Sequence, residues 1–230
     1  MNKKGRLIVI DGTDGSGKAT QARLLLRRLK KEGYKARSLD FPQYEQNFFG
    51  SLIGKALTGA YGDFIALDPH IASVLYAADR FESKKTIERW LAQGCVVVLD
   101  RFVSANQIHQ GGKIADTKER KKFLEWLEEM EFGVFGLPKP DVVLYLDVPQ
   151  EVSGWLLNEQ KSFTKKSYSK GKKDLAESDV KHQSDARASA LRILQKNNRW
   201  VRISCMEKDE LLSREVIAER VWDAVRKWGM

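Results

Sequence analysis

The chain has 230 residues, and its 42% hydrophobic share is that of an ordinary globular protein, which argues against disorder. The length suits one domain, so we expect residues 1–230 to form a single domain. The 40 basic residues outnumber the 31 acidic ones and give a net charge of +9. Such an excess is typical of proteins that bind nucleic acid, a membrane surface or a small anionic ligand.

The predicted elements alternate between strands and helices along the chain. Short apolar runs predict five strands, at Leu7–Asp11, Ala36–Leu39, Val96–Asp100, Val142–Asp147 and Trp200–Ile203. The longer stretches between them have helical periodicity, which is typical of parallel strands joined by helical crossovers. The sequence therefore predicts an α/β fold, in which a five-stranded parallel sheet is flanked by helices.

A glycine-rich segment, Gly12–Lys18 (GTDGSGK), follows the first predicted strand and opens the first predicted helix. Its glycines let successive backbone N–H groups turn toward one anion, while the helix N-terminus and Lys18 add positive charge. An ordinary strand-to-helix turn is the alternative, but the spacing, the lysine and the flanking elements favour a phosphate-binding loop (P-loop). Ala19 stands where such a loop usually has the Ser or Thr that holds magnesium, and Thr20 follows it.

The third predicted strand ends in Asp100-Arg101-Phe102, at the edge where open α/β sheets bind ligands. At that edge Asp100 can orient magnesium or its waters, and Arg101 can bridge the phosphates of a donor and an acceptor. An Asp-Arg pair is more often a solvated ion pair. Its position in a chain with a P-loop favours the functional interpretation.

Beyond the fourth strand, we expect a helix from Glu151 to about Gln160 and a second helical pattern after Asp174. Between them, Lys161–Lys173 holds six lysines and no acidic residue, so this stretch carries most of the charge imbalance. Its serines and glycine are typical of a mobile connection rather than of core.

The cysteines and the apolar runs indicate the cellular compartment in which we expect the protein. Cys95 and Cys205 each border an apolar run, as small buried residues of a reducing compartment do. The apolar runs are too short to cross a bilayer, and no signal-peptide pattern precedes the first of them. We expect a cytoplasmic protein without a membrane anchor.

Six blocks stand out along the chain: Gly12–Gln21, Phe41-Pro42, Ala60-Tyr61-Gly62, Leu75–Arg80, Asp100–Gln110 and Leu137–Pro149. Together they resemble the thymidylate kinase family, in the family's order and over nearly the whole chain. The first block fits the family's Gly-Lys-x-Thr-Gln form of the P-loop. The resemblance implies a three-layer P-loop NTPase fold with a mobile lid at roughly residues 160–178. It also implies phosphorylation of dTMP to dTDP by ATP, Mg²⁺ as the metal, and a homodimer.

The resemblance further implies roles for individual residues. The residues that would bind ATP are Gly12, Thr13, Asp14, Gly15, Ser16, Gly17, Lys18, Ala19 and Thr20 in the loop and Lys172 and Lys173 in the lid. Those that would bind dTMP are Asp14, Phe41, Pro42, Tyr76, Arg80, Arg101, Ala105, Asn106, His109 and Gln110. Catalysis would depend on Lys18, Arg101, Asp14 and Asp100, and magnesium would be held by Asp14, Asp100 and Thr20.

Within the implied dTMP site, Tyr76 would stack on thymine and Arg80 would donate to the base carbonyl O4. Asn106 would read the base edge, and His109 would lie near the sugar, where the family often has tyrosine. Gly15 places no arginine in the P-loop, in contrast to some family members, so the lid would supply the catalytic cations. The candidates are Lys165, Lys166, Lys172 and Lys173.

Two other functions stay open at this point. The fold would equally serve a kinase of another nucleotide or of a deoxynucleoside. Alternatively, a P-loop protein could bind nucleic acid through its lysine-rich stretch, but Phe163 and Tyr168 are the only stacking aromatics there and no recognition motif accompanies them. We therefore consider nucleic acid the less favoured partner.

Overall fold

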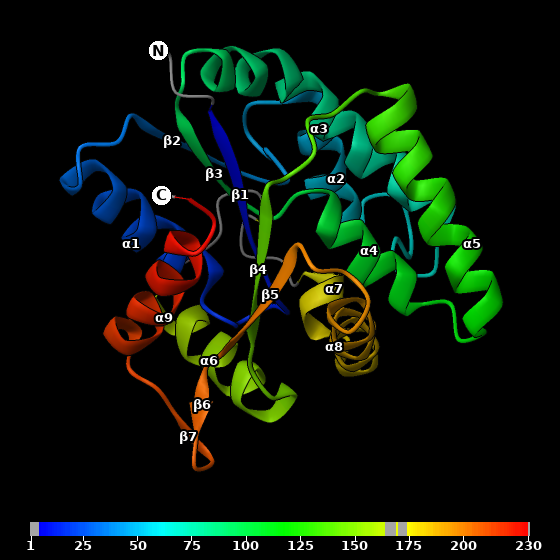
Figure 1. Ribbon diagram of the computed structural model, residues 1–230. Helices are drawn as coiled ribbons and strands as arrows, with labels where there is room; N and C mark the ends of the chain where they lie inside the picture. Colours follow the sequence, from blue (N-terminus) through cyan, green and yellow to red (C-terminus); the bar gives the residue numbers. More distant parts are fainter. Residues whose placement is uncertain (1–4, 164–168, 170–173, 230) are drawn as a thin grey trace.

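The computed structural model describes residues 5–163, 169 and 174–229 (Figure 1). A parallel sheet lies at its centre, with strand order β2-β3-β1-β4-β5. The strands are β1 (Arg6–Asp11), β2 (Ala36–Asp40), β3 (Val96–Asp100), β4 (Val142–Asp147) and β5 (Trp200–Ser204). The predicted fold is confirmed. The predicted strands differ from the observed ones by at most one residue at either end.

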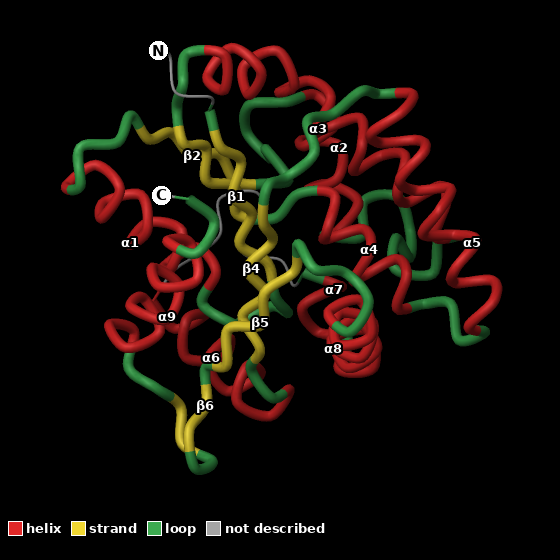
Figure 2. Tube along the Cα trace, in the orientation of Figure 1, coloured by secondary structure: helices red, strands yellow, loops and turns green. Residues whose placement is uncertain are grey.

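Helices cover both faces of this sheet (Figure 2). They are α1 (Lys18–Lys31), α2 (Phe48–Leu57), α3 (Pro69–Ala92), α4 (Val103–Gly112), α5 (Thr117–Glu128), the π-helix η1 (Glu129–Val134), α6 (Gln150–Phe163), α7 (Leu175–Ser178), α8 (Val180–Leu194) and α9 (Arg214–Arg226). Helix α6 runs three residues beyond its predicted end. The four lysines expected to act from the lid lie outside the described residues.

The core is divided by the sheet into two apolar layers. Alternate residues of β1 point to opposite faces, so Ile8 and Ile10 pack with α1 and α9, while Leu7 and Val9 pack with α3, α4 and α8. Because both faces are covered, the central strands β3, β1 and β4 are apolar runs without polar alternation, whereas the edge strands β2 and β5 include polar residues.

The carboxyl ends of β1, β2 and β3 meet at one edge of the sheet. Asp40 of β2 is in register with Asp100 of β3, and Asp100 is in register with Ile10 of β1. This alignment brings the P-loop after β1, the Phe41-Pro42 segment after β2 and the start of α4 to the same place. The sheet register therefore assembles segments that lie far apart in the sequence.

Other features lie away from this edge. A two-stranded antiparallel hairpin, β6 (Met206–Glu207) and β7 (Glu210–Leu211), was not predicted. Cys95 and Cys205 are buried and unpaired, as predicted. In the part of the chain that the structure describes, every helix is too short or too polar to span a bilayer.

Candidate functional site

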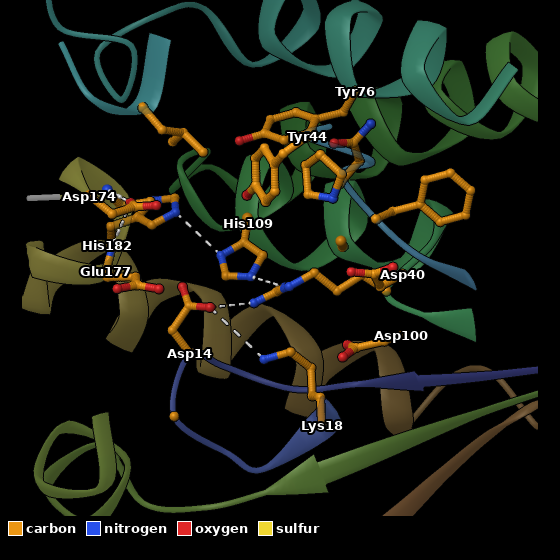
Figure 3. Close-up of a pocket in the computed structure, with 18 of the residues that line it drawn as sticks. Asp14, Lys18, Asp40, Tyr44, Tyr76, Asp100, His109, Asp174, Glu177 and His182 are labelled. Carbon is orange, nitrogen blue, oxygen red and sulfur yellow. Dashed lines mark hydrogen bonds and ion pairs between the residues drawn. The ribbon is translucent and has the colours of Figure 1, made fainter. Parts of the chain in front are cut away.

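A cavity of about 430 Å³ opens at the carboxyl edge of the sheet (Figure 3). That volume suits a small-molecule ligand. All ten residues predicted to bind dTMP line it, and so do Asp100 and six residues of the predicted ATP set: Asp14, Gly15, Gly17, Lys18, Ala19 and Thr20. Gly12, Thr13 and Ser16 are buried behind this lining. The structure thus brings the predicted residues of both substrate sets together, except for Lys172 and Lys173, which lie outside the described residues.

The P-loop joins β1 to α1 through two glycines with left-handed backbone conformations. Gly15 has φ +81° and Gly17 has φ +86°. A Cβ atom on Gly15 would overlap the carbonyl oxygen of Ser153 in α6, so the loop has no room for a side chain at that position. An arginine at this position would therefore require α6 to move.

Lys18 lies at the start of α1, and its Nζ donates to the carbonyl oxygen of Thr13 at 2.8 Å. The same nitrogen lies 3.9 Å from Asp14 Oδ1. Burial and, to a smaller extent, the nearby Arg101 together lower the pKa of Lys18 to about 8, against the opposing effect of Asp14. Burial disfavours the charged form of Lys18, and a phosphate near it would stabilise that charged form in addition to Asp14. The position of Lys18 therefore favours the binding of a phosphate.

Arg101 follows β3 with a left-handed backbone, φ 65°, which is uncommon for a residue with a side chain. Its backbone N–H donates to Ile10 at 3.0 Å. The guanidinium donates from Nη2 to Asp14 Oδ1 at 2.6 Å and lies with Nη1 2.8 Å from His109 Nε2. This unusual backbone turn directs Arg101 from the end of the sheet into the cavity, where it faces the P-loop.

Asp40 and Asp100, which are in register at the ends of neighbouring strands, both line the cavity (Figure 3). Burial raises the pKa of Asp100 to about 6, and the positive charges of Lys18 and Arg101 act in the opposite direction. Asp100 was predicted as a site residue from the sequence, but Asp40 was not. The position of Asp40 at the end of the neighbouring predicted strand could have identified it as a second carboxylate at this edge of the sheet.

Within the same cavity, Tyr76, Arg80 and Asn106 line a slot. Arg80 is 2% exposed, and its Nε and Nη2 donate to the two carboxylate oxygens of the fully buried Glu131 at 2.7 and 2.6 Å. Its Nη1 donates to the carbonyl oxygen of Phe102 at 3.2 Å. Asn106 Nδ2 donates to Ser73 O at 3.1 Å and to Glu131 Oε1 at 2.9 Å.

Glu131 was missed in the sequence because it lies in an acidic segment that resembles a solvated helix face. In the structure it belongs to the π-helix η1, whose extra residue per turn changes which side chains face inward. Glu131 holds Arg80 and Asn106 together. Both are therefore buried side chains, although their spacing in the sequence would also be compatible with polar residues at the surface.

Helix α8 supplies two further residues that the sequence did not reveal. Gln183 Nε2 donates to Asp14 Oδ2 at 2.7 Å, and its Oε1 accepts from the backbone N–H of Asp14 at 3.0 Å. The Nε2 atom of His182 lies 3.3 Å from the Nδ1 atom of His109, and the two rings stack. The cavity lining also contains Tyr44, Lys113, Asp174 and Glu177, which were not predicted to bind a substrate.

Comparison with known proteins agrees with this geometry. A family model described as thymidylate kinase matches residues 10–216. Thymidylate kinase of Mycobacterium tuberculosis is 33% identical over 148 residues, which are 64% of this chain and 68% of that one. The human enzyme is 33% identical over 147 residues, 64% of this chain and 62% of its own length.

A solved structure of thymidylate kinase from Candida albicans has the same fold. It matches with a TM-score of 0.72 at 23% identity, over 97% of this chain and 92% of that one. The family model covers most of the chain and both halves of the cavity, including the P-loop, β3 and α8. The chain therefore belongs to the thymidylate kinase family.

Proposed function

We propose that this chain transfers the γ-phosphoryl group of ATP to the 5′-phosphate of dTMP, giving dTDP and ADP. The observation that carries the proposal is the meeting of Lys18 and Arg101 in one cavity, with Asp14 between them. Two substrates with phosphate groups need cations from both sides, because their charges repel each other as they approach. Lys18 serves the donor, and Arg101 reaches both phosphates.

The reaction is a direct displacement at phosphorus. An oxygen of the dTMP phosphate forms the new bond to the γ-phosphorus, and the bond to the β,γ-bridging oxygen breaks, which releases ADP. Phosphate monoesters lose their second proton at about pH 6, so the attacking oxygen needs no general base at neutral pH. The protein contributes position and neutralisation of charge, which suffice for this chemistry.

The slot of Tyr76, Arg80 and Asn106 supports a thymine base. Both hydrogens of the Asn106 amide are used within the protein, so its Oδ1 is left to accept from a ligand. Arg80 uses one of its two Nη1 hydrogens and one of its two Nη2 hydrogens. An acceptor beside a donor matches the N3–H and O4 of thymine, whereas cytosine offers the reverse pattern. Tyr76 supplies an aromatic ring for stacking.

Magnesium fits the oxygen-bearing side chains of Asp100 and Thr20 in the cavity lining. Among the described residues, no group of three or more His, Cys, Asp or Glu side chains could hold a metal ion. Mg²⁺ at phosphate sites usually takes one or two carboxylates and completes its shell with phosphates and waters. Asp100 and Thr20 line the cavity and would hold the Mg²⁺ ion. Asp14 would contribute less to its coordination, because its carboxylate already accepts hydrogen bonds from Arg101 and Gln183. When bound, the ion would neutralise charge on the transferring group.

A phosphorylation assay tests the proposed acceptor. The purified chain is given ATP, Mg²⁺ and, in separate reactions, dTMP, dUMP, dCMP, AMP or thymidine. We expect dTMP to give the highest kcat/KM, with dCMP the poorest pyrimidine nucleotide because it reverses the hydrogen-bond pattern at Asn106. A preference for thymidine, or for AMP, would assign the fold to a different acceptor.

We also propose that two copies of the chain associate. Ile71, Val74 and Phe81 of α3 are exposed large apolar residues at helical spacing, and Phe48 of the adjacent helix α2 is exposed as well. Exposed apolar surface of this kind is typical of interfaces. Light scattering should give twice the chain mass for the native protein and the single mass for Val74→Lys, with unchanged circular dichroism. A native protein that is monomeric at micromolar concentration would contradict the proposal.

A further inference from the structure

Arg101, the arginine that faces both phosphates in the proposed function, has an unusual second partner. Its Nη2 donates to Asp14, but the nearest group to Nη1 is His109 Nε2 at 2.8 Å, while the carboxylate of Asp11 is 3.5 Å away. A guanidinium can only donate hydrogen bonds. His109 Nε2 must therefore be the acceptor, and the ring proton of His109 must lie on Nδ1.

The assignment of that proton extends to a second histidine. His109 Nδ1 lies 3.3 Å from His182 Nε2, so the Nδ1–H of His109 donates to it and His182 also carries its proton on Nδ1. The result is a chain of two hydrogen bonds with one direction, from Arg101 to His109 to His182. Both imidazoles must be neutral for this chain to exist.

The surroundings of the pair favour the neutral forms. Burial lowers the pKa of His109 well below its ordinary value, and Arg101 and His182 lower it further. Burial also lowers the pKa of His182, with a further contribution from Lys113. The charged groups that face the pair are Arg101, Lys18, Lys113, Asp14 and Asp179.

We propose that His182 of α8 is a positioning residue, which fixes the tautomer of His109 and thereby holds the Arg101 guanidinium in line with the two phosphates. A neutral imidazole suits this task, because it orients a guanidinium without cancelling its charge as a carboxylate would. The inference rests on the proposed function, since Arg101 matters only if it contacts phosphate.

The same stretch of α8 strengthens the case. Gln183, the next residue, is bonded to both the carboxylate and the backbone of Asp14, which is the other partner of Arg101. Adjacent residues of one helix therefore hold both partners of Arg101. The first turn of α8 sets the geometry of the Asp14–Arg101 pair from both ends.

The test compares His182→Phe with His182→Gln. Phenylalanine keeps a ring but removes the acceptor, so the Nδ1–H of His109 loses its partner and the tautomer that accepts from Arg101 is less favoured. Glutamine restores an acceptor oxygen. We expect kcat for dTMP to fall roughly tenfold in His182→Phe, the effect of one lost hydrogen bond, with little change in KM for ATP, and to recover in His182→Gln. His70→Gln, at an exposed histidine outside the cavity, is the matched control.

A second readout needs no activity. Two-bond ¹H–¹⁵N spectra of the full chain distinguish the two neutral tautomers of each of its three histidines. We expect the Nδ1–H form for His109 in the native protein and in His182→Gln, and loss of that form in His182→Phe. An unchanged tautomer and an unchanged kcat in His182→Phe would overturn the inference. Absence of nucleotide phosphorylation by the native chain would instead refute the proposed function, whichever tautomer is found.

Discussion

Replacing Glu131 by glutamine removes the counter-charge of Arg80 at the bottom of the base slot while side-chain volume stays the same. The carboxylate accepts from Arg80 at 2.7 and 2.6 Å and from Asn106 at 2.9 Å. A glutamine offers one acceptor oxygen and places an NH₂ group where the second oxygen was. One donor must then face another, and the buried cation loses the counter-charge that it bonds directly.

The magnitude follows from the burial of both partners. Glu131 is 0% exposed and Arg80 is 2% exposed, so solvent screens this pair very little. Loss of one partner of a buried ion pair costs about 3–5 kcal/mol. Because the amide keeps one acceptor, we expect the lower end, about 3 kcal/mol, in the free energy of unfolding. In a domain of this length that loss lowers Tm by about 6–12 °C.

Two measurements separate the structural and the functional effects. Urea unfolding gives the loss of stability, and steady-state kinetics give KM for dTMP and for ATP. Glu129→Gln, at an exposed position of the same π-helix, is the matched control and should change neither. The double variant Arg80→Met with Glu131→Leu replaces the pair by apolar groups, so it should recover most of the stability and still lose dTMP use.

Either of two results would refute this reasoning. An unchanged unfolding free energy in Glu131→Gln would mean that the charge of Arg80 is compensated by another group. An unaltered KM for dTMP in the double variant would mean that Arg80 does not contact the base.

Two further predictions concern the P-loop. Gly15→Ala should weaken ATP binding at least tenfold and lower Tm, because the new Cβ overlaps the backbone of Ser153. Gly33 has a similar φ, but a Cβ there meets no atom within 4 Å, so Gly33→Ala should show only the backbone strain of about 1 kcal/mol. Equal losses of stability in the two variants would argue against the close contact with α6. Lys18 has a pKa lowered to about 8, so it is charged at pH 7 and largely neutral at pH 9, and ATP should bind more weakly as the pH rises through 8. Because bound phosphates favour the charged form, titration calorimetry in buffers of different ionisation enthalpy should show proton uptake at pH 8.5 and little at pH 7; uptake that is equal at both values would contradict this.

The fold was predictable because its local signals agree with its packing. β1 is apolar at every position from Leu7 to Ile10, as a strand covered on both faces must be, and Gly33 follows α1 in the left-handed conformation that glycine adopts readily at helix ends. The β6–β7 hairpin had no such signal. Its turn residues, Lys208 and Asp209, both adopt positive φ without the Asn-Gly or Asp-Gly pair that usually marks such a turn.

The site was predictable only in part, and there is a physical reason why some of its residues could be predicted and others could not. Residues such as Lys18 and Arg101 follow directly from a strand, so the rule that parallel strands end at one edge brings them together. Glu131 and His182 act only through tertiary contacts, in segments whose composition resembles a solvated surface. Each of them holds, directly or through one neighbour, an arginine of the cavity. A buried arginine requires an acceptor for each donor that it does not offer to the substrate, and the identity of that acceptor is decided by packing rather than by sequence spacing. For Arg80, a carboxylate matches the charge of a residue that is to contact an uncharged base. For Arg101, which already has the carboxylate of Asp14 as one partner, a neutral imidazole as the second partner fixes direction without adding a further negative charge.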